Sequence, residues 1–143
     1  MRHRQRDNVA TALGDAERIH GRARRAADQS EQEMHAAVVR HLRQRGVPGL
    51  VFLHPANGGY RTRAEAGIFK SLGVRPGASD LLLFHDGRFY ALELKKPGGR
   101  PSEAQLEFLA DFERAGGYCA VTDDLDRALR TLEAWGLLRG TVS

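Results

Sequence analysis

The sequence predicts an α/β fold in which helices flank a mixed β-sheet. The order of the elements is one reason, because apolar periodicity, capping residues and turn formers give α-β-α-β-β-α-β-α along the chain. The runs LLLF and FYAL are a second reason, because strands that are apolar on both faces lie in the centre of a covered sheet. The length of 143 residues suffices for one domain with its own core.

The first helix is expected to begin near Asp28–Ser30 and to run to about Arg45. Two overlapping patterns at its start, D-x-x-E and S-x-x-E, fit a capping box. Gly46 is expected to end it, because glycine is common just after a helix. Its apolar stripe consists of Met34, Val38 and Leu42.

A short strand, a loop and a second helix come next. The strand is expected over Leu50–Leu53, and the loop HPANGGYR after it is dense in turn-forming residues. Thr62 and Glu65 fit a capping box for the second helix, which Gly73 closes. The apolar residues of this helix include Ala66, Phe69 and Leu72.

A β-hairpin is predicted within residues 79–96, SDLLLFHDGRFYALELKK. Asp86-Gly87 is a strong signal for a two-residue turn. This turn sets the register so that Asp80 lies opposite Glu93. Lys95 then shares a face with Glu93, because side chains alternate along a strand.

The two facing carboxylates need an explanation, because their Cβ atoms would be roughly 5 Å apart. At an effective dielectric constant of about 20, two negative charges at that distance repel by roughly 3 kcal/mol. The ammonium of Lys95, a shared proton or a divalent cation would offset this repulsion, and oxygen ligands suit Mg²⁺ or Mn²⁺. A surface salt bridge at the mouth of the hairpin is the structural alternative.

The last third of the chain predicts two helices around one strand. Ser102 caps a helix to about Ala115, and two glycines break it before a strand over Tyr118–Val121. A final helix is expected over Asp123–Trp135. The residues of the Ser102 helix that are expected to face inward are Leu106, Leu109 and Phe112.

The formal net charge of +4 is concentrated in an arm, residues 1–29, that carries seven arginines against four acidic residues. A basic arm of this kind suits phosphate attraction, and a solvated tail is an equally good explanation. Cys119 lies in an apolar run and is interpreted as a core thiol. No segment has the length of a membrane span or the pattern of a signal peptide, so a cytoplasmic protein without a membrane partner is expected.

The motifs GASD and ELK resemble those of the PD-(D/E)xK nuclease superfamily, and the chain resembles its VRR-NUC family more closely. The supporting segments occur in the family's order and cover about residues 30–135: ExEMH, HPANGGYR, FKSLGVRPGASDLLLF, YALELKKPGGRPSEAQ and AGGY. Ser79 stands where the family has proline, a position that carries no chemistry. The resemblance implies a restriction-endonuclease-like core over residues 30–143.

The resemblance also implies metal-dependent hydrolysis of DNA phosphodiesters that leaves 5′-phosphate and 3′-hydroxyl ends. Asp80, Glu93 and the backbone carbonyl of Leu94 would hold Mg²⁺ or Mn²⁺. Lys95 would orient or deprotonate the attacking water and stabilise charge on the phosphate. Gln105 matches a glutamine that family members carry after the ExK motif, although Ser102-x-x-Gln105 also fits a capping box.

A further carboxylate ligand is expected from the first helix. Glu31 is preferred because it shares the apolar stripe with Met34 and Val38, whereas Glu33 points about 160° away at roughly 100° per residue. Plain helix capping remains the alternative for both.

Nucleic-acid contacts are expected around the HPANGGYR loop. Backbone N–H groups there would bind phosphate, and two basic side chains would add charge; the candidate residues are Asn57, Gly58, Gly59, Arg61 and Lys70. His54 is interpreted as structural. No zinc site is assigned, because His35, His41 and His85 have no zinc-like spacing with a cysteine.

The function predicted from these features is that of a homodimeric nuclease selective for branched, flapped or junction DNA. Two other hypotheses stay open: a non-catalytic nucleic-acid-binding module on the same fold, and a site-specific restriction-type endonuclease. A role in DNA repair is expected, in a bacterial or phage-infected cell, with phage and host as alternative sources.

Overall fold

The computed structural model describes residues 30–56 and 62–140, and its elements follow the predicted α-β-α-β-β-α-β-α order. A helix occupies residues 30–45, and Gly46 ends it as expected. The remaining elements are β1 (Val51–Leu53), α2 (Arg63–Ser71), β2 (Leu81–His85), β3 (Arg88–Leu94), α3 (Glu103–Arg114), β4 (Tyr118–Thr122) and α4 (Leu125–Ala134).

The four strands form one mixed sheet in the order β1-β2-β3-β4. The first three strands pair antiparallel and β4 pairs parallel to β3, which confirms the predicted mixed sheet. Leu82 lies opposite Ala91, so the register predicted from the Asp86-Gly87 turn is confirmed. Asp86 has a φ of 51°, as a two-residue hairpin turn requires.

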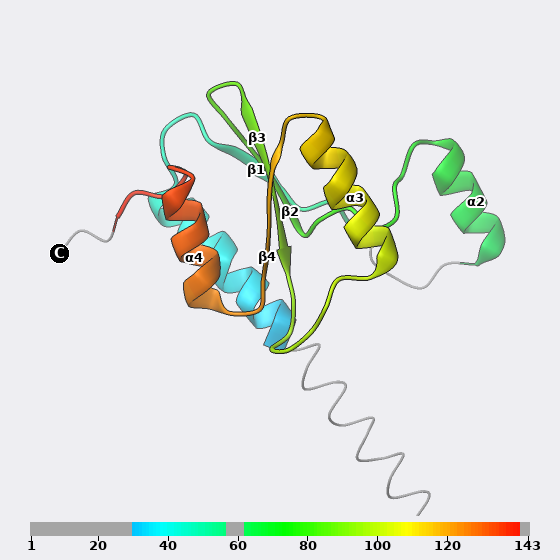
Figure 1. Cartoon of the computed structure of the whole chain (residues 1–143), viewed down its shortest axis with the longest axis horizontal. Helices are drawn as coiled ribbons and strands as arrows, with labels where there is room; N and C mark the ends of the chain where they lie inside the picture. The colour runs from blue at the N-terminus through cyan, green and yellow to red at the C-terminus, as the bar shows by residue number, and fades with distance from the viewer. Residues whose placement is uncertain (1–29, 57–61, 141–143) are drawn as a thin grey trace, which may run out of the picture.

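The helix over residues 30–45 and α4 cover one face of the sheet, where they lie side by side in Figure 1. Apolar side chains from β2 and β3 meet them in the main core, and the indole of Trp135 packs on the ring of Tyr90 with centroids 5.0 Å apart. The fully buried members of this core are Val38, Leu81, Leu83, Leu92, Leu94, Ala128, Leu132 and Leu137.

Helix α3 covers the opposite face. Leu109 is buried there, and the ring of Phe112 meets that of Phe89 edge to face at 5.2 Å. The expectation that Leu106 faces inward is wrong, because that residue is 53% exposed. The inward stripe of α3 runs through Gln105, and Leu106 is turned away from it by about 100°.

The predicted capping boxes of α2 and α3 are both confirmed. Thr62 and Ser102 each accept a hydrogen bond from the backbone three residues on, and Glu65 and Gln105 accept one in return. Helix α2 has no buried residue and stands apart from the sheet in Figure 1. Within the described ranges, no helix is long and apolar enough to span a membrane.

Candidate functional site

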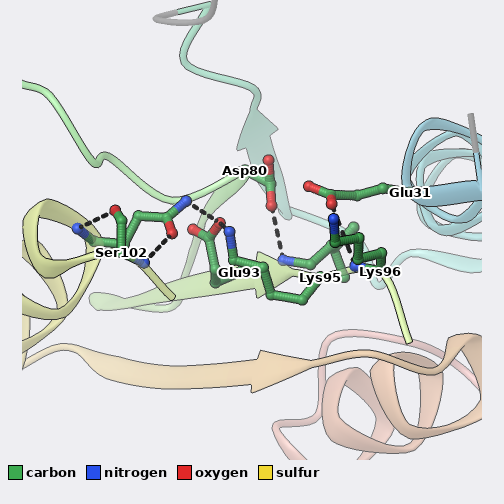
Figure 2. A network of polar contacts seen from close by, with 8 residues as sticks. Glu31, Asp80, Glu93, Lys95, Lys96 and Ser102 are labelled. Carbon is green, nitrogen blue, oxygen red and sulfur yellow. Dashed lines mark hydrogen bonds and ion pairs between the residues drawn. The ribbon is translucent and has the colours of Figure 1, made fainter. Parts of the chain in front are cut away.

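The predicted acids meet where β2 begins and β3 ends. The ladder between these strands stops at the pair Leu81 and Leu92, one position short of Asp80. An Asp80 carboxylate oxygen then accepts a hydrogen bond from the backbone N–H of Leu94 at 2.7 Å. In a continued ladder, a main-chain carbonyl would accept the hydrogen bond from the Leu94 N–H. The side chain of Asp80 accepts it instead, and this contact fixes the orientation of the carboxylate (Figure 2).

The segment that leads into Asp80 is held against α3. The guanidinium of Arg75 binds the carboxylate of Asp111 at 2.5 Å. Gly77 has a φ of 77°, and a Cβ atom at that position would lie 2.4 Å from the carbonyl of Ala104. Backbone therefore approaches backbone at Gly77, which places the segment before Asp80 on the start of α3.

Glu93 is the buried acid of the site, with 1% of its surface exposed. Its Oε1 atom accepts a hydrogen bond from Gln105 Nε2 at 2.7 Å and lies 3.8 Å from Lys95 Nζ. Its Oε2 atom is buried and has no hydrogen-bond partner among the residues that the structure describes. A buried carboxylate oxygen without a donor is costly, which makes this atom a candidate ligand.

Burial and, after it, the neighbouring Asp80 carboxylate together raise the pKa of Glu93 to about 8. The ammonium of Lys95 opposes this effect only in part. This pKa favours the protonated form of Glu93 at neutral pH in the metal-free protein. The Asp80 carboxylate therefore favours the protonated form of Glu93, in agreement with the predicted repulsion between the two acids.

The first helix brings Glu31 to the same end of the sheet. Its carboxylate accepts a hydrogen bond from the backbone N–H of Lys96 at 3.2 Å, just beyond β3 (Figure 2). Glu33 is exposed and lines a different hollow with Pro97 and Asp123. This placement favours Glu31 over Glu33, and a ligand role for Glu31 remains a prediction.

The residues present fit a divalent cation. The side chains of Glu31, Asp80 and Glu93 supply carboxylate oxygens at one end of β3, and no described residue donates to Oε2 of Glu93. Hard oxygen donors of this kind suit Mg²⁺ or Mn²⁺. The backbone carbonyl of Leu94 stays a predicted fourth donor.

Of the five predicted nucleic-acid contacts, Lys70 falls within the described residues. Asn57, Gly58, Gly59 and Arg61 lie outside the described residues. Lys70 is exposed in the last turn of α2 and lines a hollow with Phe69 and Val74. Its role as a contact to nucleic acid remains a prediction.

Two histidines that were not assigned to the site lie beside Asp80. One ring nitrogen each of His35 and His54 and a carboxylate oxygen of Asp80 lie within 4.8 Å of one another. Burial and, after it, the neighbouring His54 lower the pKa of His35, which favours the neutral ring. The i,i+4 spacing of Glu31 and His35 on one helix was the available signal, because such residues share a face.

Comparisons with known proteins support the fold. A scan against models of known protein families finds no match, and neither does a sequence search of curated proteins. Among solved structures, the chain is similar to a "VRR_NUC domain protein", with a TM-score of 0.56 and 18% sequence identity. The match covers 72% of this chain and 84% of that chain. The chain therefore has the fold of a VRR_NUC domain protein, and the α/β restriction-endonuclease-like architecture that its motifs predict is confirmed.

Proposed function

We propose that the chain is a VRR-NUC family nuclease that hydrolyses DNA phosphodiester bonds with Mg²⁺ or Mn²⁺. One observation carries the proposal: the acids Asp80 and Glu93 and the ammonium of Lys95 converge at the end of β3, in a fold shared with a VRR_NUC domain protein. A structural salt bridge with Lys95 would need only one acid. Here a second acid, Asp80, lies close enough to help burial raise the pKa of Glu93.

Each residue of the site has a role in this proposal. Asp80 is oriented by the Leu94 N–H, and Gln105 fixes one oxygen of Glu93, so the two carboxylates present their other oxygens in defined positions. Lys95 is 16% exposed, and its ammonium lies 3.8 Å from Oε1 of Glu93. That ammonium would orient the attacking water and stabilise the charge that develops on the phosphate.

The divalent ion, held by Glu31, Asp80, Glu93 and the Leu94 carbonyl, would supply Lewis-acid stabilisation of the reacting phosphate. We expect 5′-phosphate and 3′-hydroxyl product ends, as the family resemblance implies. Selectivity for branched, flapped or junction DNA and a homodimeric state belong to the same proposal. A dimer would bring two sites to two strands of one substrate.

The test is cleavage of end-labelled duplex, flap, four-way junction and single-stranded DNA by the full chain, with Mg²⁺, Mn²⁺ or chelator. We expect cleavage of at least one branched substrate that chelator abolishes. Glu93→Gln should abolish cutting while the thermal melt shows a folded protein. Glu107→Gln, an exposed acid-to-amide change on α3, is the matched control and should cut like the parent.

Three results would count against parts of the proposal. Unchanged cleavage by Glu93→Gln would remove the assigned site. Metal-dependent DNA binding without cleavage would favour the non-catalytic module. Cleavage of unbranched duplex at one sequence would favour a restriction-type enzyme, and sedimentation of a monomer at cleaving concentrations would remove the dimer.

A further inference from the structure

Three side chains that can bind a metal meet beside the proposed nuclease site, and each comes from a different part of the fold. His35 lies on the helix over residues 30–45, His54 follows β1, and Asp80 precedes β2. One potential ligand atom of each lies within 4.8 Å of the others. Together with Glu31 they line a solvent-accessible hollow of about 330 Å³.

The ring of His54 is held in place by a contact to the backbone. Its Nδ1 atom lies 2.6 Å from the main-chain carbonyl oxygen of Asp80. A carbonyl oxygen only accepts hydrogen bonds, so Nδ1 carries the proton and Nε2 keeps an unprotonated lone pair. Metal-binding histidines typically donate their other ring N–H to a carbonyl or carboxylate in this way.

The rings of His35 and His54 meet edge to face, with centroids 4.6 Å apart. A tetrahedral zinc site with bonds of about 2.0–2.1 Å places its ligand atoms roughly 3.4 Å apart. The observed separation of up to 4.8 Å requires inward movement on the order of 1 Å, which side-chain rotation of the exposed His54 can supply.

The donor chemistry here differs from that of the oxygen site around Glu93. Imidazole nitrogen suits Zn²⁺ and other divalent transition ions, whereas carboxylate and carbonyl oxygens suit Mg²⁺ and Mn²⁺. Asp80 has two carboxylate oxygens and borders both groups, with one oxygen on the Leu94 N–H.

We propose that His35, His54 and Asp80 form a second metal site, selective for an imidazole-binding divalent transition ion such as Zn²⁺. Three protein ligands leave a coordination position open to the hollow. This inference rests on the proposed function only in that the two sites share Asp80, because the binding of Zn²⁺ can be measured without any cleavage.

The first experiment titrates chelator-treated full-length protein with Zn²⁺ alone and with Mg²⁺ alone by calorimetry. His35→Asn and His54→Asn should each weaken Zn²⁺ binding by at least about 10- to 100-fold, the range reported for losing even a supporting residue of a metal site. Their Mg²⁺ binding should change by less than about twofold. His85→Asn, at the far end of the hairpin, is the matched control and should bind both ions like the parent.

The second experiment needs no variant, so it does not depend on how a variant folds. Long-range ¹H–¹⁵N spectra of the histidine rings are recorded with one equivalent of Zn²⁺. We expect shifts at the unprotonated nitrogens of His35 and His54, with Nδ1 of His54 still protonated. Shifts at other histidines instead, or Zn²⁺ affinity unchanged in both asparagine variants, would overturn the second site.

Glu93→Gln separates this inference from the proposed function. The variant should lose Mg²⁺ binding and keep Zn²⁺ binding. A parent protein that binds Zn²⁺ through His35 and His54 but cuts no DNA would leave the second site standing and remove the nuclease. A protein that cuts DNA with Mg²⁺ but shows no histidine-dependent Zn²⁺ binding would leave the nuclease standing and remove the second site.

Discussion

The side-chain amide of Gln105 donates a hydrogen bond to Oε1 of Glu93 at 2.7 Å while its own oxygen accepts from the backbone of Ser102. One residue therefore completes a helix cap and orients a buried acid. The two explanations that the sequence leaves open for Gln105, capping and a place in the site, are not alternatives in this fold.

The first prediction separates these two contributions of Gln105. Ser102→Ala removes only the cap and should lower the free energy of unfolding by about 1 kcal/mol. Gln105→Ala should destabilise by a similar amount and also lower cleavage by about tenfold or more, because Glu93 loses its orienting donor. Urea unfolding and single-turnover cleavage measure the two effects. Equal loss of cleavage in both variants would assign Gln105 to the cap alone.

The second prediction concerns pH and the pKa of Glu93. Burial raises this pKa from 4.5 to about 8, so the folded chain keeps a proton between these values that the unfolded chain releases. The free energy of unfolding of metal-free protein should therefore fall as pH rises across this window and level off above it. Melts from pH 4 to 9 measure the slope.

Glu93→Gln should remove that slope, because an amide does not titrate, while Glu107→Gln should retain it. Mg²⁺ binds the ionised form, so the increase in Tm with Mg²⁺ should be larger at pH 8 than at pH 6. The same slope in Glu93→Gln as in the parent would place its origin elsewhere.

The third prediction separates cation binding from cutting. Lys95→Ala should lower the cleavage rate by about 10²- to 10⁴-fold, the usual contribution of a group that positions or transfers a proton. Calorimetry should show Mn²⁺ affinity undiminished, because the ammonium lies beside the acids and does not supply a ligand. Arg130→Ala removes an equal charge from α4 and should behave like the parent. Loss of Mn²⁺ binding in Lys95→Ala would contradict the division of roles.

The fourth prediction tests the contact that holds the segment before Asp80. Gly77→Ala should destabilise the fold by more than Gly73→Ala, although both glycines have positive φ, because only Gly77 lies against the backbone of Ala104. The overpacking should cost about 1–3 kcal/mol beyond the shared backbone strain and should weaken Mg²⁺ binding by displacing Asp80. Equal melting temperatures for the two variants would show that the segment before Asp80 accommodates the added methyl group without a cost in stability.

The hairpin was predictable because its register depends on local chemistry. A two-residue Asp86-Gly87 turn allows few pairings, and the register that it sets ends at Leu81 and Leu92, next to Asp80 and Glu93. Capping residues likewise fixed where α2 and α3 begin. The exposure of Leu106 could not be predicted from helical period, because Gln105 and Leu106 were equally able to define the inward stripe.

Features that join distant segments were also beyond the sequence. His35, His54 and Asp80 meet only because the helix over residues 30–45 packs beside the ends of β1 and β2. No spacing along the chain records that packing. The sequence likewise does not show that the ladder stops before Asp80. Nor does it show that the Asp80 side chain replaces a main-chain acceptor there.

Because Asp80 accepts a hydrogen bond from the Leu94 N–H, an aspartate at this position in a relative would be weak evidence that the relative is catalytic. A relative that had ceased to cut would still need an acceptor there to keep the sheet from fraying, so aspartate would persist under selection for folding alone. Among the described residues, the side chain of Glu93 has no hydrogen bond to the backbone, and its burial costs energy. Whether a relative has kept the proposed activity is therefore better judged from the presence of Glu93 than from that of Asp80.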